Sequence, residues 1–472
     1  MDFSKASAFL DGIWDDEIIP ALTDYIRIPN KSPAFDKDWE AHGHMEKATQ
    51  MFAAWAKSKL AQFPGSALEI VRLPGRTPLI FIEIPGDAPG TVLMYGHLDK
   101  QPEMPGWADD LGPWQPVVKD GKLYGRGGAD DGYAMFASIA ALLALKQQGA
   151  KHARAVIIIE ACEESGSPDL PFYIDHLSAR IGTPDLVVCL DSGCGNYEQL
   201  WLTTSLRGNL IGALTVKVLT EGVHSGAASG IVPSSFRILR MLLSRIEDEA
   251  TGRMKLPELF AEIPAERQTQ AKEAAVILGD EVWTGAPFAG RTKPMAQGNA
   301  ELILEKTWRP QLAVTAMDGY ALPANGGNVL LPYSTAKISV RLPPTLEAEV
   351  ARSALKKTLE ASPPYDADVT FDVPRGDNGW NAPTLAPWLE ASLNKASTSA
   401  FGKPVAYQGE GGSIPFMAML GEKFPGTQFV VTGVLGPHSN AHGPNEFLHI
   451  GFAKKLSACI ATVLADHALE VS

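Results

Sequence analysis

Histidines and carboxylates stand in short clusters along the sequence, each closely after a short apolar run. These pairs of run and cluster are Thr91–Tyr95 with His97 and Asp99, Ala155–Ala161 with Glu163 and Glu164, Leu186–Leu190 with Asp191, and Gln428–Leu435 with His438 and His442. Imidazole nitrogen together with carboxylate oxygen favours zinc, with manganese or cobalt as alternatives, over ions that prefer thiolates. The residues therefore predict a metal centre at the place where the fold brings these clusters together.

The chemistry expected of such a centre is hydrolysis. His97 and Asp99 are two residues apart, so in an extended segment both face the same side, and the carboxylate can orient the imidazole. Glu163 and Glu164 are adjacent and face opposite sides of a strand end, so one can bind metal while the other acts as general base. Two ions roughly 3.5–4 Å apart can share the attacking water and stabilise the tetrahedral intermediate of amide hydrolysis.

A further acidic pair lies in the glycine-rich segment Leu123–Gly132, immediately before a predicted apolar helix. One of Asp130 and Asp131 is explained as the cap of that helix. The other needs a different explanation, and a carboxylate held in such a turn can bridge two cations with one oxygen on each. The residues alone leave open which aspartate bridges, and whether His438 or His442 is the ligand.

The apolar runs before these clusters have the composition of strands buried on both faces. Together with Leu79–Ile84 they are expected to build one sheet, and the helical patterns Ala48–Gln62 and Tyr133–Gln148 lie between them. Such alternation predicts an α/β sandwich with a mainly parallel sheet. Ligands bind beyond the carboxyl ends of the strands in such sheets, so the scattered clusters are expected to form one site.

Residues 205–380 follow a different pattern, which predicts an inserted α+β domain that serves as a lid or for dimerisation. Leu210–Leu219 and Thr335–Leu342 alternate like strands with one exposed face, and Glu247–Leu278 is rich in alanine and glutamate, which indicates helix. The catalytic, metal-binding domain is then discontinuous and comprises residues 1–204 and 381–472.

Composition excludes several classes of protein. The formal net charge of -13 argues against a nucleic-acid partner, which needs clustered lysine and arginine. Four cysteines in 472 residues are too few for a disulfide framework and are expected to be reduced. Because no apolar stretch reaches the roughly 20 residues of a membrane span and the N-terminus lacks a signal-peptide pattern, a cytoplasmic protein without membrane contact is expected.

The ordered motifs of the sequence resemble those of metallopeptidase family 20, and in particular its carnosinase-like branch of dinuclear dipeptidases. The motifs are YGHLD with QPE in Tyr95–Glu103, LYGRGGADDG in Leu123–Gly132, EACEESGS in Glu160–Ser167, LDSG in Leu190–Gly193, SLRG in Ser205–Gly208, GVHSG in Gly222–Gly226, GEGGSIP in Gly409–Pro415 and AHGPNE in Ala441–Glu446. The resemblance covers nearly the whole chain, and its specificity comes from the ordered set rather than from any single motif.

The resemblance implies a role for each residue of the metal centre. The five implied ligands are His97 and Asp191 on one metal, Glu164 and His442 on the other, and Asp130 as the bridge. Asp99 would orient His97, and Glu163 would be the general base.

In the inserted domain, His224 of GVHSG resembles the histidine that reaches the active site of the partner subunit and polarises the scissile carbonyl, which implies a homodimer. Arg341 matches an arginine that binds the free carboxylate of the substrate, a task that suits a guanidinium fork. Asn328 and Ser413 align with further substrate contacts.

The chain departs from the family pattern at Gly132, where relatives commonly have the lysine of a DDKG motif. Lys100 stands after HLD, at a position that is usually apolar. Our hypothesis is that Lys100 supplies, near the metals and Asp131, the positive charge missing at Gly132.

The function expected from these residues is hydrolysis of dipeptides or short peptides by a metal-bridging water that Glu163 activates. The alternative is an N-acyl-amino-acid amidohydrolase, although such deacylases usually have a shorter inserted domain. A non-catalytic peptide- or metal-binding relative would lack the base or a ligand, and none is missing here.

Overall fold

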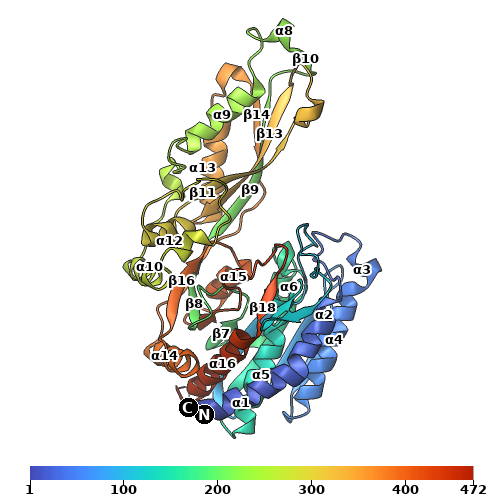
Figure 1. Ribbon diagram of the computed structural model, residues 1–472, viewed down its shortest axis with the longest axis vertical. Helices are drawn as coiled ribbons and strands as arrows, with labels where there is room; N and C mark the ends of the chain where they lie inside the picture. The colour runs from blue at the N-terminus through green and yellow to red at the C-terminus, as the bar shows by residue number, and fades with distance from the viewer. Residues whose placement is uncertain (471–472) are drawn as a thin grey trace. The chain divides into compact units, whose positions relative to one another are not determined.

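The computed structural model describes residues 1–470, which divide into two compact units whose elements are labelled in Figure 1. Unit 1 comprises Met1–Thr204, Ala382–Gln408 and the chain from Met419 onward, and unit 2 comprises Ser205–Asn381 and Gly409–Ala418. The segment Gly409–Ala418 falls in the range that the sequence predicts for the catalytic domain. The residues at which the chain passes from one unit to the other lie in or next to four elements: β8 (Trp201–Leu206), β15 (Trp380–Asn381), β16 (Ala406–Glu410) and α15 (Pro415–Lys423).

Unit 1 is built on a six-stranded sheet in the order β1-β2-β6-β3-β7-β17. Its strands are β1 (Ala67–Val71), β2 (Leu79–Ile84), β3 (Ala88–His97), β6 (Ala153–Glu160), β7 (Leu186–Cys189) and β17 (Gln428–Val431). β6, β3, β7 and β17 run parallel to one another, β2 runs antiparallel to β6, and the edge strand β1 runs antiparallel to β2. The predicted α/β fold with a mainly parallel sheet is confirmed. The half-exposed strand β1 has no continuous apolar run and was not predicted.

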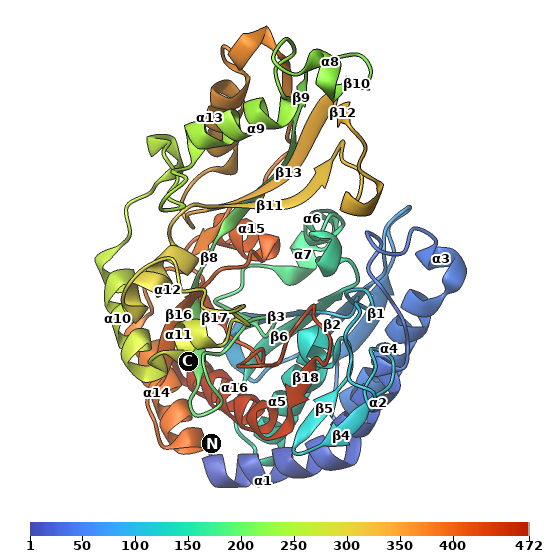
Figure 2. The same ribbon diagram turned by 45° about the horizontal axis from the view of Figure 1, so that its top comes forward.

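Helices α4 (His44–Leu60), α5 (Ala134–Gln147) and α16 (Ile450–Glu470) pack against this sheet (Figure 2). Every residue of α5 from Ala134 to Leu145 is buried, which explains why its sequence has no polar face. The other α-helices of unit 1 are α1 (Phe3–Ile13), α2 (Ile19–Ile26), α3 (Trp39–His42), α6 (Leu170–His176), α7 (Ser178–Ile181) and α14 (Pro387–Phe401). A small sheet is formed by β4 (Val117–Lys119), β5 (Lys122–Tyr124) and β18 (Phe447–His449).

Unit 2 has an antiparallel sheet in the order β11-β13-β9-β14. The strands are β9 (Gly208–Lys217), β11 (Gln311–Asp318), β13 (Tyr333–Leu342) and β14 (Asp368–Asp372). Helices α9 (Ser235–Ile246) and α13 (Ala348–Glu360) pack against β9 and its neighbours, and alternate strand residues join them in a separate apolar core. Further elements are α8 (Ser225–Ala228), α10 (Ala265–Leu278), α11 (Glu281–Thr284), α12 (Asn299–Thr307), β10 (Val223–His224) and β12 (Val329–Leu330).

The helical stretch predicted over Glu247–Leu278 is wrong in its first half. Residues 247–264 contain only a short 3-10 turn, Pro257–Leu259, and α10 begins at Ala265. Pro257 and Pro264 cannot donate a backbone hydrogen bond inside a helix, and proline is tolerated where a helical turn begins.

Strand β17 ends at Val431, before the predicted end at Leu435, because the chain then turns against the segment that follows β7. A Cβ atom added to Gly433 would lie 1.9 Å from the backbone oxygen of Ser192, so only glycine permits this approach. The N–H of Cys194 donates to the oxygen of Leu435 at 3.1 Å. The contact holds the segment just after β7 against the neighbouring strand.

Among the described residues, no helix combines the length and the apolarity needed to cross a bilayer. The four cysteines are buried, and none forms a disulfide bond within the described residues. Burial raises the pKa of the Cys459 thiol, which disfavours a reactive thiolate.

Candidate metal centre

Several predicted ligands lie at one edge of the sheet in unit 1. β6, β3 and β7 are parallel neighbours, so their carboxyl ends come together. His97 is the last residue of β3, Glu163 and Glu164 open a 3-10 turn after β6, and Asp191 follows β7. The scattered clusters of the sequence therefore meet, as a parallel sheet requires.

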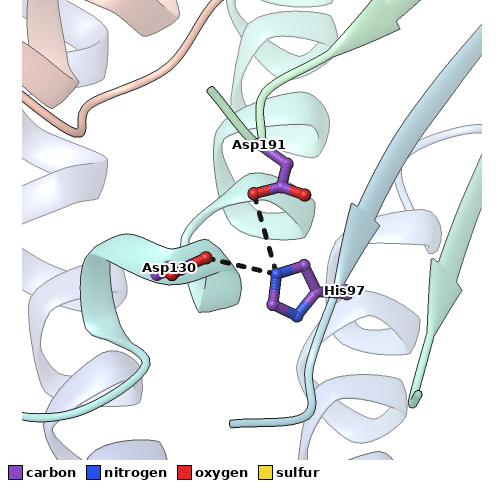
Figure 3. Close-up of side chains that lie close together, drawn as sticks. All are labelled: His97, Asp130 and Asp191. Carbon is purple, nitrogen blue, oxygen red and sulfur yellow. Dashed lines mark ion pairs between the residues drawn. The ribbon is translucent and has the colours of Figure 1, made fainter. Parts of the chain in front are cut away.

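The first group of ligands comprises His97, Asp130 and Asp191 (Figure 3). His97 Nε2 lies 3.3 Å from Asp130 Oδ1 and 3.7 Å from Asp191 Oδ1, the two contacts drawn as dashed lines. All three residues are buried. One divalent ion can thus be held by a nitrogen and two oxygens from three separate elements.

The second group comprises Asp130, Glu164 and His442. His442 Nε2 lies 3.0 Å from Asp130 Oδ2 and 3.3 Å from Glu164 Oε2. Gln101 Nε2 donates to the same Glu164 oxygen at 2.5 Å. Because Asp130 presents one oxygen to His97 and the other to His442, it belongs to both groups and is able to bridge two ions.

The charges of these residues fit two cations. Without a bound cation, burial raises the pKa of Glu163 and Glu164, and repulsion from Asp191 and Asp130, respectively, raises them further. Burial also raises the pKa of Asp191. His97 Nε2 is buried and has no hydrogen-bond partner among the described residues. Buried carboxylates that repel one another, beside an unpartnered imidazole nitrogen, are stabilised when a divalent ion binds among them.

Asp99 connects the two clusters that follow β3 and β6. Its Oδ1 accepts the N–H of Glu163 and its Oδ2 accepts the N–H of Glu164, each at 3.0 Å. His97 Nδ1 lies 3.1 Å from the backbone oxygen of Asp99 and 3.5 Å from Oδ1. The buried residue Asp99 therefore contacts the imidazole mainly through its backbone oxygen and holds the glutamate turn through its carboxylate.

The two aspartates in the turn before α5 contact different partners. Asp130 faces the imidazoles, whereas Asp131 Oδ2 accepts the backbone N–H of His97 at 3.3 Å. The peptide between these aspartates is cis. A Cβ atom on Gly96 would lie 2.8 Å from Asp131 Oδ2 and 2.6 Å from the Cβ of Ala134, so glycine in the YGHLD motif permits this packing.

The chain matches a known protein family. The model of peptidase family M20/M25/M40 matches residues 93–466, a stretch that contains every residue of both ligand groups. The chain belongs to peptidase family M20/M25/M40. The predicted family is thereby confirmed, and with it the prediction of a metallopeptidase.

Members of this family and related structures resemble the chain over most of its length. It is 27% identical to the cysteinylglycine-S-conjugate dipeptidase of Corynebacterium striatum over 423 residues, 85% of this chain and 88% of that protein. The structure of the dipeptidase Dug1p from Saccharomyces cerevisiae has a TM-score of 0.80 at 21% identity and covers 99% of each chain. Human carnosine dipeptidase 1 has a TM-score of 0.77 at 22% identity, over 99% of this chain and 100% of that chain. Both structures confirm the fold.

Two of the residues that the M20 resemblance assigns to the substrate lie close together in unit 2. His224 ends β10, which pairs with β12. The N–H of Ser225 donates to the backbone oxygen of Asn328 at 2.9 Å, so the chain segments of His224 and Asn328 are neighbours. Both residues are exposed.

The other two, Arg341 and Ser413, both lie in the neighbourhood of Arg207 in the same unit. The backbone N–H of Arg207 donates to Gly412 beside Ser413 at 3.1 Å. Burial, with the nearby charge of Arg341, lowers the pKa of Arg207 to about 10. Burial lowers the pKa of Arg341, and the charge of Asp377 offsets this in part. Among the described residues Arg341 forms no ion pair, so its guanidinium is suited to an additional anion.

The hypothesis on Lys100 is wrong. Its Nζ donates to the backbone oxygens of Tyr25 and Ile28, each at 2.8 Å, and lies 3.8 Å from the centre of the Tyr25 ring. The described part of the chain contains no ion pair between Lys100 and Asp131. A Cβ atom on Gly132 would lie 2.3 Å from the Tyr25 ring, so the departure from the M20 pattern at this position is a matter of packing.

Three polar residues beside the ligands were missed, namely Gln101, Arg126 and Glu446. Gln101 holds Glu164, and Arg126 pairs with Glu446 in the interior. All three stand inside motifs quoted for the M20 resemblance, QPE, LYGRGGADDG and AHGPNE. Polar residues within ligand motifs are candidates for holding the ligands, a signal that could have found them.

Metal binding should tighten as pH rises from 6 to 8. Burial lowers the pKa of His97 and of His442, but the neighbouring carboxylates outweigh it and raise both pKa values above the usual range. Below those pKa values a proton occupies the nitrogen that the metal needs, so binding must release it. We expect a loss in Zn²⁺ affinity of about 10-fold or more at pH 6. Calorimetry in two buffers of different ionisation enthalpy measures the released protons.

The control for this titration is the variant His442→Ala, which should release fewer protons than wild type at pH 6. Equal affinity at both pH values, with no proton released, would contradict the expected competition.

Proposed function

We propose that the protein is a two-metal dipeptidase that cleaves dipeptides or short peptides from their N-terminal end. The observation that carries this proposal is Asp130, which faces His97 with one oxygen and His442 with the other. The three relatives named above are a cysteinylglycine-S-conjugate dipeptidase, a dipeptidase and a carnosine dipeptidase, which supports dipeptides as substrates rather than N-acyl amino acids.

His97 and Asp191 would hold one ion, Glu164 and His442 the other, and Asp130 would bridge them. Nitrogen and oxygen ligands of this kind favour Zn²⁺, with Mn²⁺ or Co²⁺ as alternatives. When bound, the ions would supply Lewis acidity that lowers the pKa of water and polarises the scissile carbonyl.

Glu163 would be the general base. Its carboxylate belongs to neither ligand group, and its backbone N–H is held by Asp99, next to the N–H of the ligand Glu164. Glu163 would take a proton from the attacking water and pass it to the leaving amine. Asp99 would hold this turn and His97 in position relative to each other.

The substrate contacts would come from unit 2. Arg341 would bind the terminal carboxylate of the peptide, which is supported by its having no ion pair within the described part of the chain, and Ser413 would lie near the same end. His224 and Asn328 would bind the scissile peptide group.

We further propose a homodimer formed through unit 2. β11 is an edge strand of its sheet, and its residues Ala313–Asp318 are exposed, with Val314 at 47% and Met317 at 43%. An exposed edge strand with apolar side chains favours pairing with another chain, which supports a second copy of this protein as partner. Four buried cysteines without a disulfide bond within the described residues support a reducing, cytoplasmic location.

The proposed base is tested by the variant Glu163→Gln. Because glutamine cannot accept the proton, kcat should fall by at least about 100-fold, whereas the metal content should stay near two ions per chain. The matched control is Glu103→Gln, which alters a glutamate that pairs with Lys31. Metal analysis beside steady-state kinetics gives both readings, and turnover that persists in Glu163→Gln would refute the assigned role.

The substrate class is tested with a metal-supplemented panel of dipeptides, dipeptide amides, and N-acetyl and N-succinyl amino acids. Dipeptides should be hydrolysed, and their amides should show a raised KM because Arg341 loses its anion. Faster hydrolysis of the acylated substrates would overturn the proposal in favour of a deacylase.

The proposed partner role of His224 is tested by mixing two inactive variants, Glu163→Gln and His224→Ala. If His224 acts in the active site of the partner, a mixed dimer contains one intact site, and equal mixing should restore about one quarter of wild-type activity. Each variant alone should stay inactive. Activity that remains at the sum of the separate variants would show that His224 does not act across subunits.

A further inference from the structure

Arg126 and Glu446 form a fully buried ion pair that belongs to neither ligand group. Arg126 Nη1 lies 2.6 Å from Glu446 Oε2, and the two side chains are 1% and 0% exposed. Taking two charges out of water is costly, and the ion pair itself offsets this cost only in part. An ion pair buried in this way is therefore expected to do more than stabilise the fold.

The remaining contacts of Arg126 lead to the loop of a metal ligand. Its Nη2 donates to the backbone oxygen of His442 at 3.1 Å and to that of Gly443 at 2.7 Å. Its Nε donates to the backbone oxygen of Pro102 at 3.2 Å. The planar guanidinium therefore holds the backbone at His442 while it pairs with Glu446.

The remaining contacts of Glu446 lead to the turn of the other ligand. Its Oε1 accepts the N–H of Gly127 at 2.9 Å, and its backbone oxygen accepts the N–H of Gly125 at 3.0 Å. Gly127 immediately precedes the turn Gly128–Gly132, which carries Asp130. One ion pair thus connects the segments of two ligands that are distant in the sequence.

The loop around His442 needs such a connection because its backbone conformation is unfavourable without contacts that hold it. His438, Asn440, His442 and Asn445 all have positive φ, with 65° at His442. Non-glycine residues are strained in this region of backbone conformation and persist only where the surroundings hold them.

We propose that Arg126 and Glu446 are positioning residues for the second metal, the ion held by Asp130, Glu164 and His442. This inference rests on the proposed two-metal centre. The contacts of the ion pair lead to the segments of two of the three residues in the second ligand group but only to that of Asp130 in the first, where His97 is held by Asp99 and Asp131. Loss of the ion pair should therefore weaken the two metals unequally.

The experiment measures Zn²⁺ affinity at each site by competition with a chromophoric chelator, together with the thermal stability of the metal-free protein. The single variants are Arg126→Lys, which keeps the charge but loses the planar fork, and Glu446→Gln. The double variant Arg126→Met with Glu446→Leu removes both charges, a change that buried ion pairs often tolerate without loss of stability. His442→Ala identifies which affinity belongs to the second site.

We expect affinity for the second metal to fall about 10- to 100-fold in Glu446→Gln and in the double variant, the range seen when residues that hold a ligand are lost. Affinity for the first metal should stay within about 3-fold of wild type, and Arg126→Lys should lie between. The control Arg154→Lys alters another ion pair of unit 1, with Glu83 at 2.7 Å, and should leave both affinities unchanged.

Two results would overturn the positioning role. One is wild-type affinity for both metals in a folded double variant, and the other is an equal loss at both sites that follows a loss of stability, since a purely structural residue would act on both. If instead the wild-type chain binds no second ion, the proposed two-metal centre itself fails, and the inference falls with it. The double variant and Arg126→Lys keep the test decisive where Glu446→Gln does not fold.

Discussion

The rest of unit 1 depends on one constraint, namely that several carboxylates are buried close together. Glu163, Glu164 and Asp191 lie close enough to Asp130 and to one another for burial and repulsion to raise their pKa values. A low dielectric constant strengthens such repulsion, so the fold must surround these carboxylates with cations and N–H donors. The strand ends and the glycines around these carboxylates allow such groups to approach them.

Rigid elements carry the ligands, and buried polar groups hold the short segments between them. His97 ends a strand that is paired on both sides, and the turn of Asp130 leads into α5, a helix buried on every side. Asp99 takes both N–H groups of the glutamate turn, so one side chain aligns ligands from two strands. Gly96 leaves room for the side chains of Asp131 and Ala134, and Gly433 lets its backbone approach that of Ser192.

The sequence predicts those parts of the fold and site that depend on local composition. β2 has the predicted bounds, Leu79–Ile84, because burial on both faces demands a continuous apolar run. The choice between Asp130 and Asp131 depends instead on the path of one turn, and that between His438 and His442 on a loop without periodicity, which only the family motifs decided. Lys100 was misjudged because its ammonium binds carbonyls some seventy residues away in the chain, a contact that no local pattern encodes.

The order of the ligands along the chain has a consequence for how the protein is made. The first ligand group is complete in sequence at Asp191, whereas the second needs His442, which follows the whole of unit 2. A chain emerging from the ribosome therefore offers the first set of ligands before unit 2 and completes the second set only after unit 2. Because strand β17 and helix α16 of unit 1 also follow unit 2, the sheet that positions both ligand groups is completed only after unit 2 has been synthesised.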